Sequence, residues 1–254
     1  MAITISHHRR SGWWTLFTLV VSLALTLRLW GLNSDEVRTD EGNYALRAIG
    51  WNDFMFSTAL GTPWVWFQEL PQVPAWTLLS FNDHPPLHFG TIWLAVRAFG
   101  IHLWAVRLPS ALYGGGAVAG LMLLLRRWGY PGSSLAAGAL LAVLPWHIFI
   151  SRQAVQESGV IFWILLTLLS AARASSAADG PRSGWRWAAV GLALAGGLLT
   201  KYSAAVVMLP LAWLTLRRRW YRRAGFWWAP GALVALLSPL AYYNCRLYLL
   251  RGHF

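Results

Sequence analysis

The sequence predicts an all-α integral membrane protein, with about seven transmembrane helices and a long first extracytoplasmic loop that contains interfacial helices. Three observations support this fold class. Of the 254 residues, 57% are hydrophobic. Only 12% are charged, about half the share that is usual in a soluble globular domain. The apolar residues form runs near the length of a membrane span, and clusters of arginine separate the runs. This composition excludes a soluble enzyme.

Seven apolar runs are candidate spans. They cover residues 12–32, 108–125, 133–150, 158–172, 185–200, 202–216 and 224–243. No small-x-small cleavage site follows the first run, which predicts an uncleaved anchor and not a removed signal peptide. The 13 residues of 87–99 are too short to span and predict a re-entrant or interfacial helix. A single helix over 187–216 would reach about 45 Å, so we expect two short helices that turn at 200–203.

The distribution of charge predicts the orientation. The formal net charge of +12 would suggest a nucleic-acid partner if the basic residues formed one face of a soluble domain. They instead lie in short clusters between apolar runs, which is typical of a topology signal, so we expect no nucleic-acid partner. With a cytoplasmic amino terminus, most arginines fall inside and most acids outside. This pattern predicts a multi-pass protein of the inner, or plasma, membrane.

The first outer loop, residues 33–107, is rich in tryptophan and proline. The prolines prevent one long helix, and the tryptophans are costly to expose to water, so we expect short helices and turns along the membrane surface. The part from 41 to 60 is only weakly amphipathic and does not predict a single helix. Elsewhere, a lone cysteine, Cys245, excludes a disulfide framework and a cysteine-based zinc site.

Candidate chemistry lies among the polar residues at the outer ends of the runs. Asp40 and Glu41 follow Thr39, so they are typical either of a helix start with favourable acids in its first turn or of a reaction centre. Adjacent helical residues do not face each other, which means that these two cannot form an acid pair on their own. A second acid would have to be Glu157 or Asp83.

The other polar residues each have an ordinary structural interpretation as well. Asp83 and His84 precede two prolines, as at a helix start, but His84 could also hold a divalent cation with Asp40 or Glu157. Arg152 and Glu157 could form an ordinary interfacial ion pair. The only lysine, Lys201, could extend to the membrane surface or bind a lipid phosphate.

Five ordered motifs together resemble a known family, the GT-C membrane glycosyltransferases of the protein O-mannosyltransferase and lipid A aminoarabinose transferase type. The motifs are DEGNYA at 40–45, HPPL at 84–87, RLPSAL at 107–112, SRQA at 151–154 with an acid at 157, and LLTKYS at 198–203. The resemblance covers nearly the whole chain. It implies a membrane glycosyltransferase that moves a sugar, with inversion, from a polyprenyl-phosphate donor to a lipid, glycan or protein acceptor at the outer face.

The resemblance also implies roles for individual residues. Asp40 would be the base at the reaction centre or a metal ligand, and Glu41 would support it. The donor would be bound through its phosphate by four residues: His84, Arg107, Arg152 and Lys201. If a cofactor is used, we expect a divalent cation, Mg²⁺ or Mn²⁺, held by Asp40 and Glu157. Glu157 departs from the family, which often has aspartate in the second outer loop.

The length also departs from the pattern, because members are usually about twice as long. We therefore expect residues 1–254 to form a single GT-C transmembrane module, which could be the amino-terminal part of a longer enzyme. Two alternatives stay open. A catalytically inactive polyprenyl-phosphate-binding module would bind the carrier without turnover. A transporter would need polar residues at the membrane centre, which the predicted spans almost lack.

Overall fold

The computed structural model describes residues 2–50, 81, 84–176, 180 and 182–251. These residues form helices and no strands. In chain order the helices are α1 (Ala2–Leu29), α2 (Thr39–Gly50), α3 (Leu87–Phe99), α4 (Leu103–Arg127), α5 (Pro131–Val143), α6 (Pro145–Ser151), α7 (Glu157–Ser175), α8 (Ser183–Thr200), the 3₁₀-helix η3 (Tyr202–Val207), α9 (Met208–Arg218), the short η4 (Trp220–Arg222) and η5 (Ala224–Trp227), and α10 (Trp228–Arg251).

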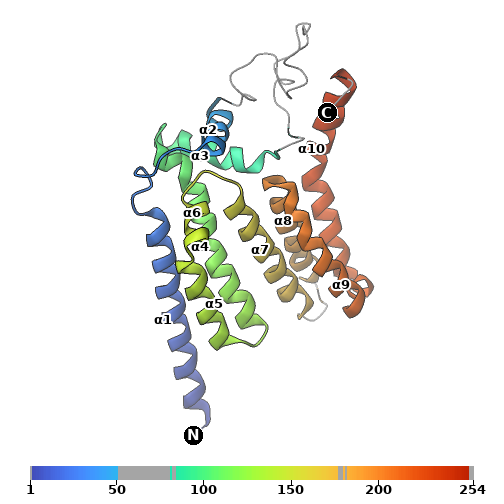
Figure 1. The fold of residues 1–254 in the computed structure, drawn as a ribbon. Coiled ribbons are helices and arrows are strands. Elements are labelled where there is room, and N and C mark those ends of the chain that lie inside the picture. The colour runs from blue at the N-terminus through green and yellow to red at the C-terminus, as the bar shows by residue number, and fades with distance from the viewer. Residues whose placement is uncertain (1, 51–80, 82–83, 177–179, 181, 252–254) are drawn as a thin grey trace.

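The long helices stand side by side as a bundle, and α2 and α3 lie across one of its ends (Figure 1). Helix α4 is central because it packs against α1, α3, α5 and α7, and α8 joins α7 to α10. Among the described residues, four helices are long and apolar enough to cross a membrane, or five if the bent pair α5–α6 counts as one span. The chain is thus a multi-pass membrane protein, and the seven-span count stays a prediction.

The predicted runs coincide with the helices to within a few residues at most ends. The short apolar segment is a helix over Leu87–Phe99, and α8 ends at Thr200, where Lys201 is extended. The predicted turn at 200–203 is therefore confirmed. A helix over Thr39–Gly50 forms where the pattern of 41–60 predicted no single helix. Residues 51–80, which include most of the loop tryptophans and prolines, lie outside the described residues.

One expected span is broken. The run 133–150 was predicted as a single helix, but α5 and α6 meet at an angle of 62°. Pro145 explains the break, because proline has no N–H to continue the helix and disfavours helical geometry in the residue before it. Leu144 is accordingly extended, with φ −62° and ψ 115°.

A buried arginine satisfies the main chain at this break. Arg28 of α1 is fully buried. Its Nη1 donates to the carbonyl of Ala142 at 3.0 Å, and its Nη2 donates to that of Leu141 at 3.2 Å. The Nη2 also lies 2.6 Å from Nδ1 of His147, which therefore accepts a hydrogen bond. Helix α1 thereby supplies the donors that the bend removes from α5 and α6.

Candidate functional site

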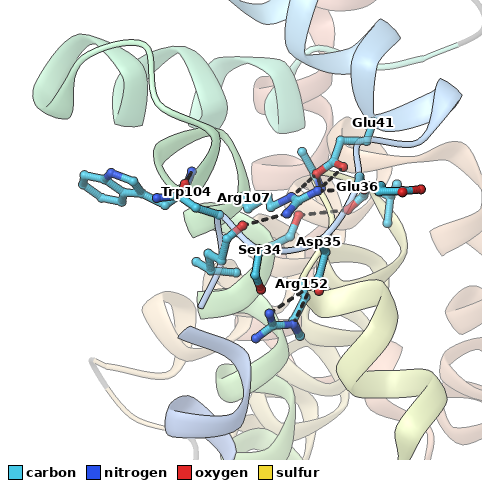
Figure 2. A network of polar contacts seen from close by, with 12 residues as sticks. Ser34, Asp35, Glu36, Glu41, Trp104, Arg107 and Arg152 are labelled. Atoms are coloured by element: carbon cyan, nitrogen blue, oxygen red, sulfur yellow. Dashed lines mark hydrogen bonds and ion pairs between the residues drawn. The ribbon is translucent and has the colours of Figure 1, made fainter. Parts of the chain in front are cut away.

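A buried ion pair fixes the first turn of α2. The Nε of Arg107 donates to Oε1 of Glu41 at 2.6 Å, and its Nη2 donates to Oε2 at 2.7 Å. Neither side chain is exposed. The other donor contacts of Arg107 go to the carbonyls of Leu32 and Glu36, and Oε1 of Glu41 also accepts the N–H of Ala154 at 2.9 Å. One carboxylate therefore connects α2, α4 and the segment before α7 (Figure 2).

Asp40 has the opposite environment. Its side chain is exposed, although the next residue is fully buried. It forms no hydrogen bond or ion pair with any residue that the structure describes. This difference confirms the prediction that adjacent helical residues cannot pair with each other. The buried pair of Glu41 and Arg107 thus holds α2 in place while the carboxylate of Asp40 stays accessible at this end of the bundle.

A second ion pair forms where α7 begins and α8 ends. The Nζ of Lys201 donates to Oε1 of Glu157 at 2.6 Å, and both side chains keep partial exposure, 33% and 43%. Solvent weakens such a pair, so its contribution to folding is small. The ammonium of Lys201 consequently remains accessible to a ligand, in contrast to the buried guanidinium of Arg107.

Two histidines lie near this second pair. The Nε2 of His84 is 2.8 Å from the hydroxyl of Tyr44. His88 is fully buried, and its Nε2 lies 3.1 Å from the carbonyl of Ala154, to which it donates. Burial lowers the pKa of His88 from 6.5 to about 4, partly offset by the Ala154 carbonyl and by Glu157. His88 is therefore neutral at physiological pH.

Arg152 is occupied mainly by the end of α1. Its Nη1 donates to the carbonyls of Leu27 and Trp30, and its Nη2 donates to that of Gly31 at 2.9 Å. The same guanidinium is 2.9 Å from Oδ2 of Asp35. A cation at a helix carboxyl terminus satisfies carbonyls that lack partners within the helix and opposes the negative end of its dipole. This arrangement makes Arg152 a cap for α1.

A cavity of about 690 Å³ lies beside this cap, at the same end of the bundle. Ser34, Glu36 and Arg38 from the segment after α1 line one part of it, and Phe149 of α6 lines another. The guanidinium of Arg38 is 4.8 Å from the centre of the Phe149 ring. The cavity thus combines charged groups with an apolar wall next to the buried network that Figure 2 shows.

The structure gathers the predicted site residues at one end of the bundle. This end carries α2, the starts of α3, α4 and α7, and the end of α8 (Figure 1). The predicted residues on these elements are Asp40 and Glu41 on α2, His84 before α3, Arg107 near the start of α4, Arg152 before α7, Glu157 at the start of α7, and Lys201 after α8. Asp83 lies outside the described residues. The catalytic and phosphate-binding roles stay predictions. The guanidinium groups of Arg107 and Arg152 already donate to carboxylate and carbonyl oxygens.

The expected divalent cation stays a prediction. Among the residues that the structure describes, no three histidine, cysteine, aspartate or glutamate side chains come together to hold an ion. Asp40 is exposed, and Glu157 is paired with Lys201.

Sequence reasoning missed three residues at this end, namely His88, Tyr44 and Asp35. The ring of Tyr44 contacts both histidines, with its centre 5.1 Å from that of His84 and 6.2 Å from that of His88. The spacing of four between His84 and His88 was the available signal, since it could have suggested a shared face. Nothing in the pattern of Asp35 indicated that it would pair with a residue 117 positions away.

Comparisons with known proteins identify a family. A family model described as dolichyl-phosphate-mannose-protein mannosyltransferase matches residues 83–243. Undecaprenyl phosphate-alpha-4-amino-4-deoxy-L-arabinose arabinosyl transferase of Pseudomonas paraeruginosa is 31% identical over 185 residues, which are 71% of this chain and 32% of that protein. The protein of the same name from Pseudomonas aeruginosa is 30% identical over 185 residues, with the same coverage. The chain therefore spans about a third of the length of these relatives.

A solved structure shows the same fold. The S. cerevisiae protein O-mannosyltransferase Pmt1-Pmt2 complex bound to the sugar donor matches with a TM-score of 0.65 at 18% sequence identity. The match covers 95% of this chain and 34% of the yeast chain. At this identity the likeness concerns the arrangement of helices. It shows that this chain shares its overall fold with part of that yeast protein.

Proposed function

Because this chain belongs to the dolichyl-phosphate-mannose-protein mannosyltransferase family of GT-C membrane proteins, we propose that it forms the reaction-centre module of a membrane glycosyltransferase. Its donor would be a sugar on a polyprenyl phosphate, and the acceptor would be a lipid, glycan or protein hydroxyl. The reaction would take place at the outer face of the inner membrane, with the amino terminus cytoplasmic. The names of the relatives support the donor class, because they include an undecaprenyl-phosphate-sugar transferase.

One observation carries the proposal: an exposed carboxylate is held beside a fully buried ion pair. The bidentate contact of Glu41 with Arg107 fixes α2 through two short charge-assisted hydrogen bonds. Asp40 is one residue away and exposed. The ion pair with Arg107 accounts for Glu41, whereas the accessible carboxylate of Asp40 is available for chemistry.

Asp40 would act as the general base. It would take the proton of the acceptor hydroxyl as that oxygen forms a bond to the anomeric carbon of the donor sugar. The bond between this carbon and the phosphate oxygen would break, and its electron pair would leave with the polyprenyl phosphate. One displacement inverts the anomeric configuration. Glu41 would support Asp40 by fixing the helix turn that carries it.

Lys201 and His84 are the residues that we propose to meet the donor phosphate. Lys201 offers a partly exposed point charge close to Glu157, and His84 lies on the same side of the bundle beside Tyr44. Stabilising the charge on the departing phosphate is the larger electrostatic demand of such a transfer. Arg107 and Arg152 were also predicted to bind phosphate. Their contacts favour positioning roles, since a phosphate would have to displace groups that they already hold.

The test is an Asp40→Asn substitution in the full chain, assayed in membranes. The donors would be undecaprenyl phosphate-4-amino-4-deoxy-L-arabinose and a polyprenyl-phosphate mannose, and released polyprenyl phosphate would be measured. We expect at least a 100-fold loss of release, because general-base catalysis contributes about that factor or more. The matched control is Glu36→Gln, which makes the same chemical change at an exposed carboxylate of the same segment.

Full activity of the Asp40 variant would remove the base assignment. Tight binding of polyprenyl phosphate by the unaltered chain, without release from either donor in the presence of membrane acceptors, would instead favour the carrier-binding module. Comparing the anomeric configuration of donor and product tests inversion separately. Retention of configuration would exclude a single displacement.

A further inference from the structure

A second pocket lies at the opposite end of the bundle from the candidate site. It has a volume of about 670 Å³ and is formed where α4 and α7 end and where α9 meets η4. Three arginines line it, Arg127, Arg218 and Arg223. The carboxyl ends of α4, α7 and α9 all lie at this lower end of the molecule in Figure 1. The proposed transfer reaction does not use any of these residues.

The charge of this pocket is strongly one-sided. Neither Arg127 nor Arg218 forms an ion pair with a residue that the structure describes. Arg127 donates to the hydroxyl of Ser176, and Arg223 donates to the carbonyl of Ser175 at 2.9 Å, so both are drawn toward the end of α7. The side chains of Arg127 and Arg218 are exposed. Two accessible guanidinium groups therefore share one opening with a third that is anchored.

Part of the pocket lining is apolar. It includes Leu168, Ala171, Leu214 and Trp128, and half of the surface of Trp128 is exposed. Tryptophan at such a position is typical of the zone where lipid head groups meet hydrocarbon. A small anion would satisfy the arginines but not this apolar lining. A ligand with a phosphate head and a hydrocarbon part would satisfy both.

We propose that this pocket binds the head group of an anionic phospholipid from the leaflet opposite the candidate site. The guanidinium groups of Arg127 and Arg218 would contact the phosphodiester, and an acyl chain would begin against Leu168 and Leu214. The site lies at the far end of the bundle from the donor site proposed above. Its occupancy is independent of sugar transfer, and its test requires no enzymatic activity.

The experiment measures lipid retention by native mass spectrometry. The purified full chain is equilibrated with phosphatidylglycerol, with phosphatidylcholine as the neutral reference. We expect selective retention of phosphatidylglycerol, and a roughly 30-fold weaker retention when Arg127→Gln and Arg218→Gln are combined. The matched control combines Arg182→Gln with Arg186→Gln. That pair removes the same charge from two exposed positions near the same end, outside this pocket.

Three outcomes would overturn the proposal. An equal loss of phosphatidylglycerol retention in the two double variants would mean that the lipid binds only through the general positive charge of this end. Displacement of phosphatidylglycerol by millimolar inorganic phosphate would identify a simple anion site. The third arm uses Leu168→Trp, which fills the apolar part without changing charge, and which we expect to reduce retention at least fivefold. Unchanged retention in this variant would exclude an acyl chain in the pocket, even if the arginine variants failed to fold.

Discussion

Glu41 and Asp40 differ in burial although they are neighbours in the chain, and this difference separates stability from chemistry at the residue scale. Glu41 is fully buried with Arg107, so each charge depends on the other. Asp40 is exposed and has no partner among the described residues. Breaking a buried ion pair by removing one charge strands the other in a low-dielectric environment, whereas changing an exposed carboxylate costs little.

We therefore expect Glu41→Gln to lower the free energy of unfolding by about 3 kcal/mol or more. Asp40→Asn should change it by less than about 0.5 kcal/mol. Unfolding of the purified variants in detergent, followed by circular dichroism, measures both. The combined Glu41→Gln and Arg107→Gln variant should be less unstable than the sum of the two single changes. A fully stable Glu41→Gln protein would contradict the role of this pair.

His88 gives the fold a dependence on pH. Burial lowers its pKa in the folded protein to about 4, against 6.5 in the unfolded chain. Between these values the unfolded chain binds a proton that the folded protein does not. Stability is therefore complete above pH 6.5 and falls as the pH drops toward 4, by at most roughly 3 kcal/mol from this group.

The measurement is the unfolding midpoint at pH 7 and at pH 5, for the unaltered protein and for His88→Gln. Glutamine can still donate to the carbonyl of Ala154 but does not titrate in this range. We expect the difference between the two pH values to shrink in the variant. A substitution of Glu157 or Lys201 should leave most of this pH difference in place, because these side chains shift the pKa of His88 less than burial does. An identical pH response in His88→Gln would contradict the assignment.

At the scale of elements, the bend between α5 and α6 depends on a residue of α1. Arg28 donates to the carbonyls of Ala142 and Leu141, whose helical partners are disturbed by Pro145. We expect Arg28→Met to destabilise the protein by about 2 kcal/mol, because it leaves buried acceptors without donors. Arg97→Met, the same change at an exposed position on α3, is the control. Equal thermal stability of the two variants would show that the bend holds without Arg28.

The same elements show how far the sequence could predict the fold. The apolar runs located the helices because the length of a hydrophobic run is a local property of the chain. The turn at Lys201 was predictable for the same reason. The break at Pro145 was missed because the run 133–150 was long and apolar enough to pass as one span. The contacts of Arg28, Glu41 and Arg152 were beyond prediction. Each joins positions more than 60 residues apart, and a run or a spacing contains no information about which distant group will be the partner.

The sequence predicted where the candidate site residues lie better than it predicted what each of them does. The positions of Asp40, Glu157 and Lys201 at the ends of the apolar runs predicted that they lie at one end of the bundle, and the structure agrees. The motifs could not distinguish an arginine that binds ligand from one that holds the protein together. Arg107 and Arg152 have the residue type that a phosphate requires, yet burial and carbonyl contacts occupy their donors. Such contacts appear only in three dimensions.

At the scale of the whole molecule, the number of membrane crossings is still to be determined. The described helices give four or five by length and hydropathy, whereas the sequence predicts seven. If α8 and the pair η3–α9 each cross the membrane, Ser203 and Tyr221 lie on opposite sides of it. In a Cys245→Ser background, Ser203→Cys should react with a membrane-impermeant maleimide in intact spheroplasts, while Tyr221→Cys should react only after permeabilisation. Both positions are exposed, so access to the reagent depends on sidedness and not on burial. Reaction of both cysteines in intact spheroplasts would exclude a crossing by η3–α9. It would also place the arginines of the lower pocket on the same side as the candidate site, against the charge asymmetry that orients the chain.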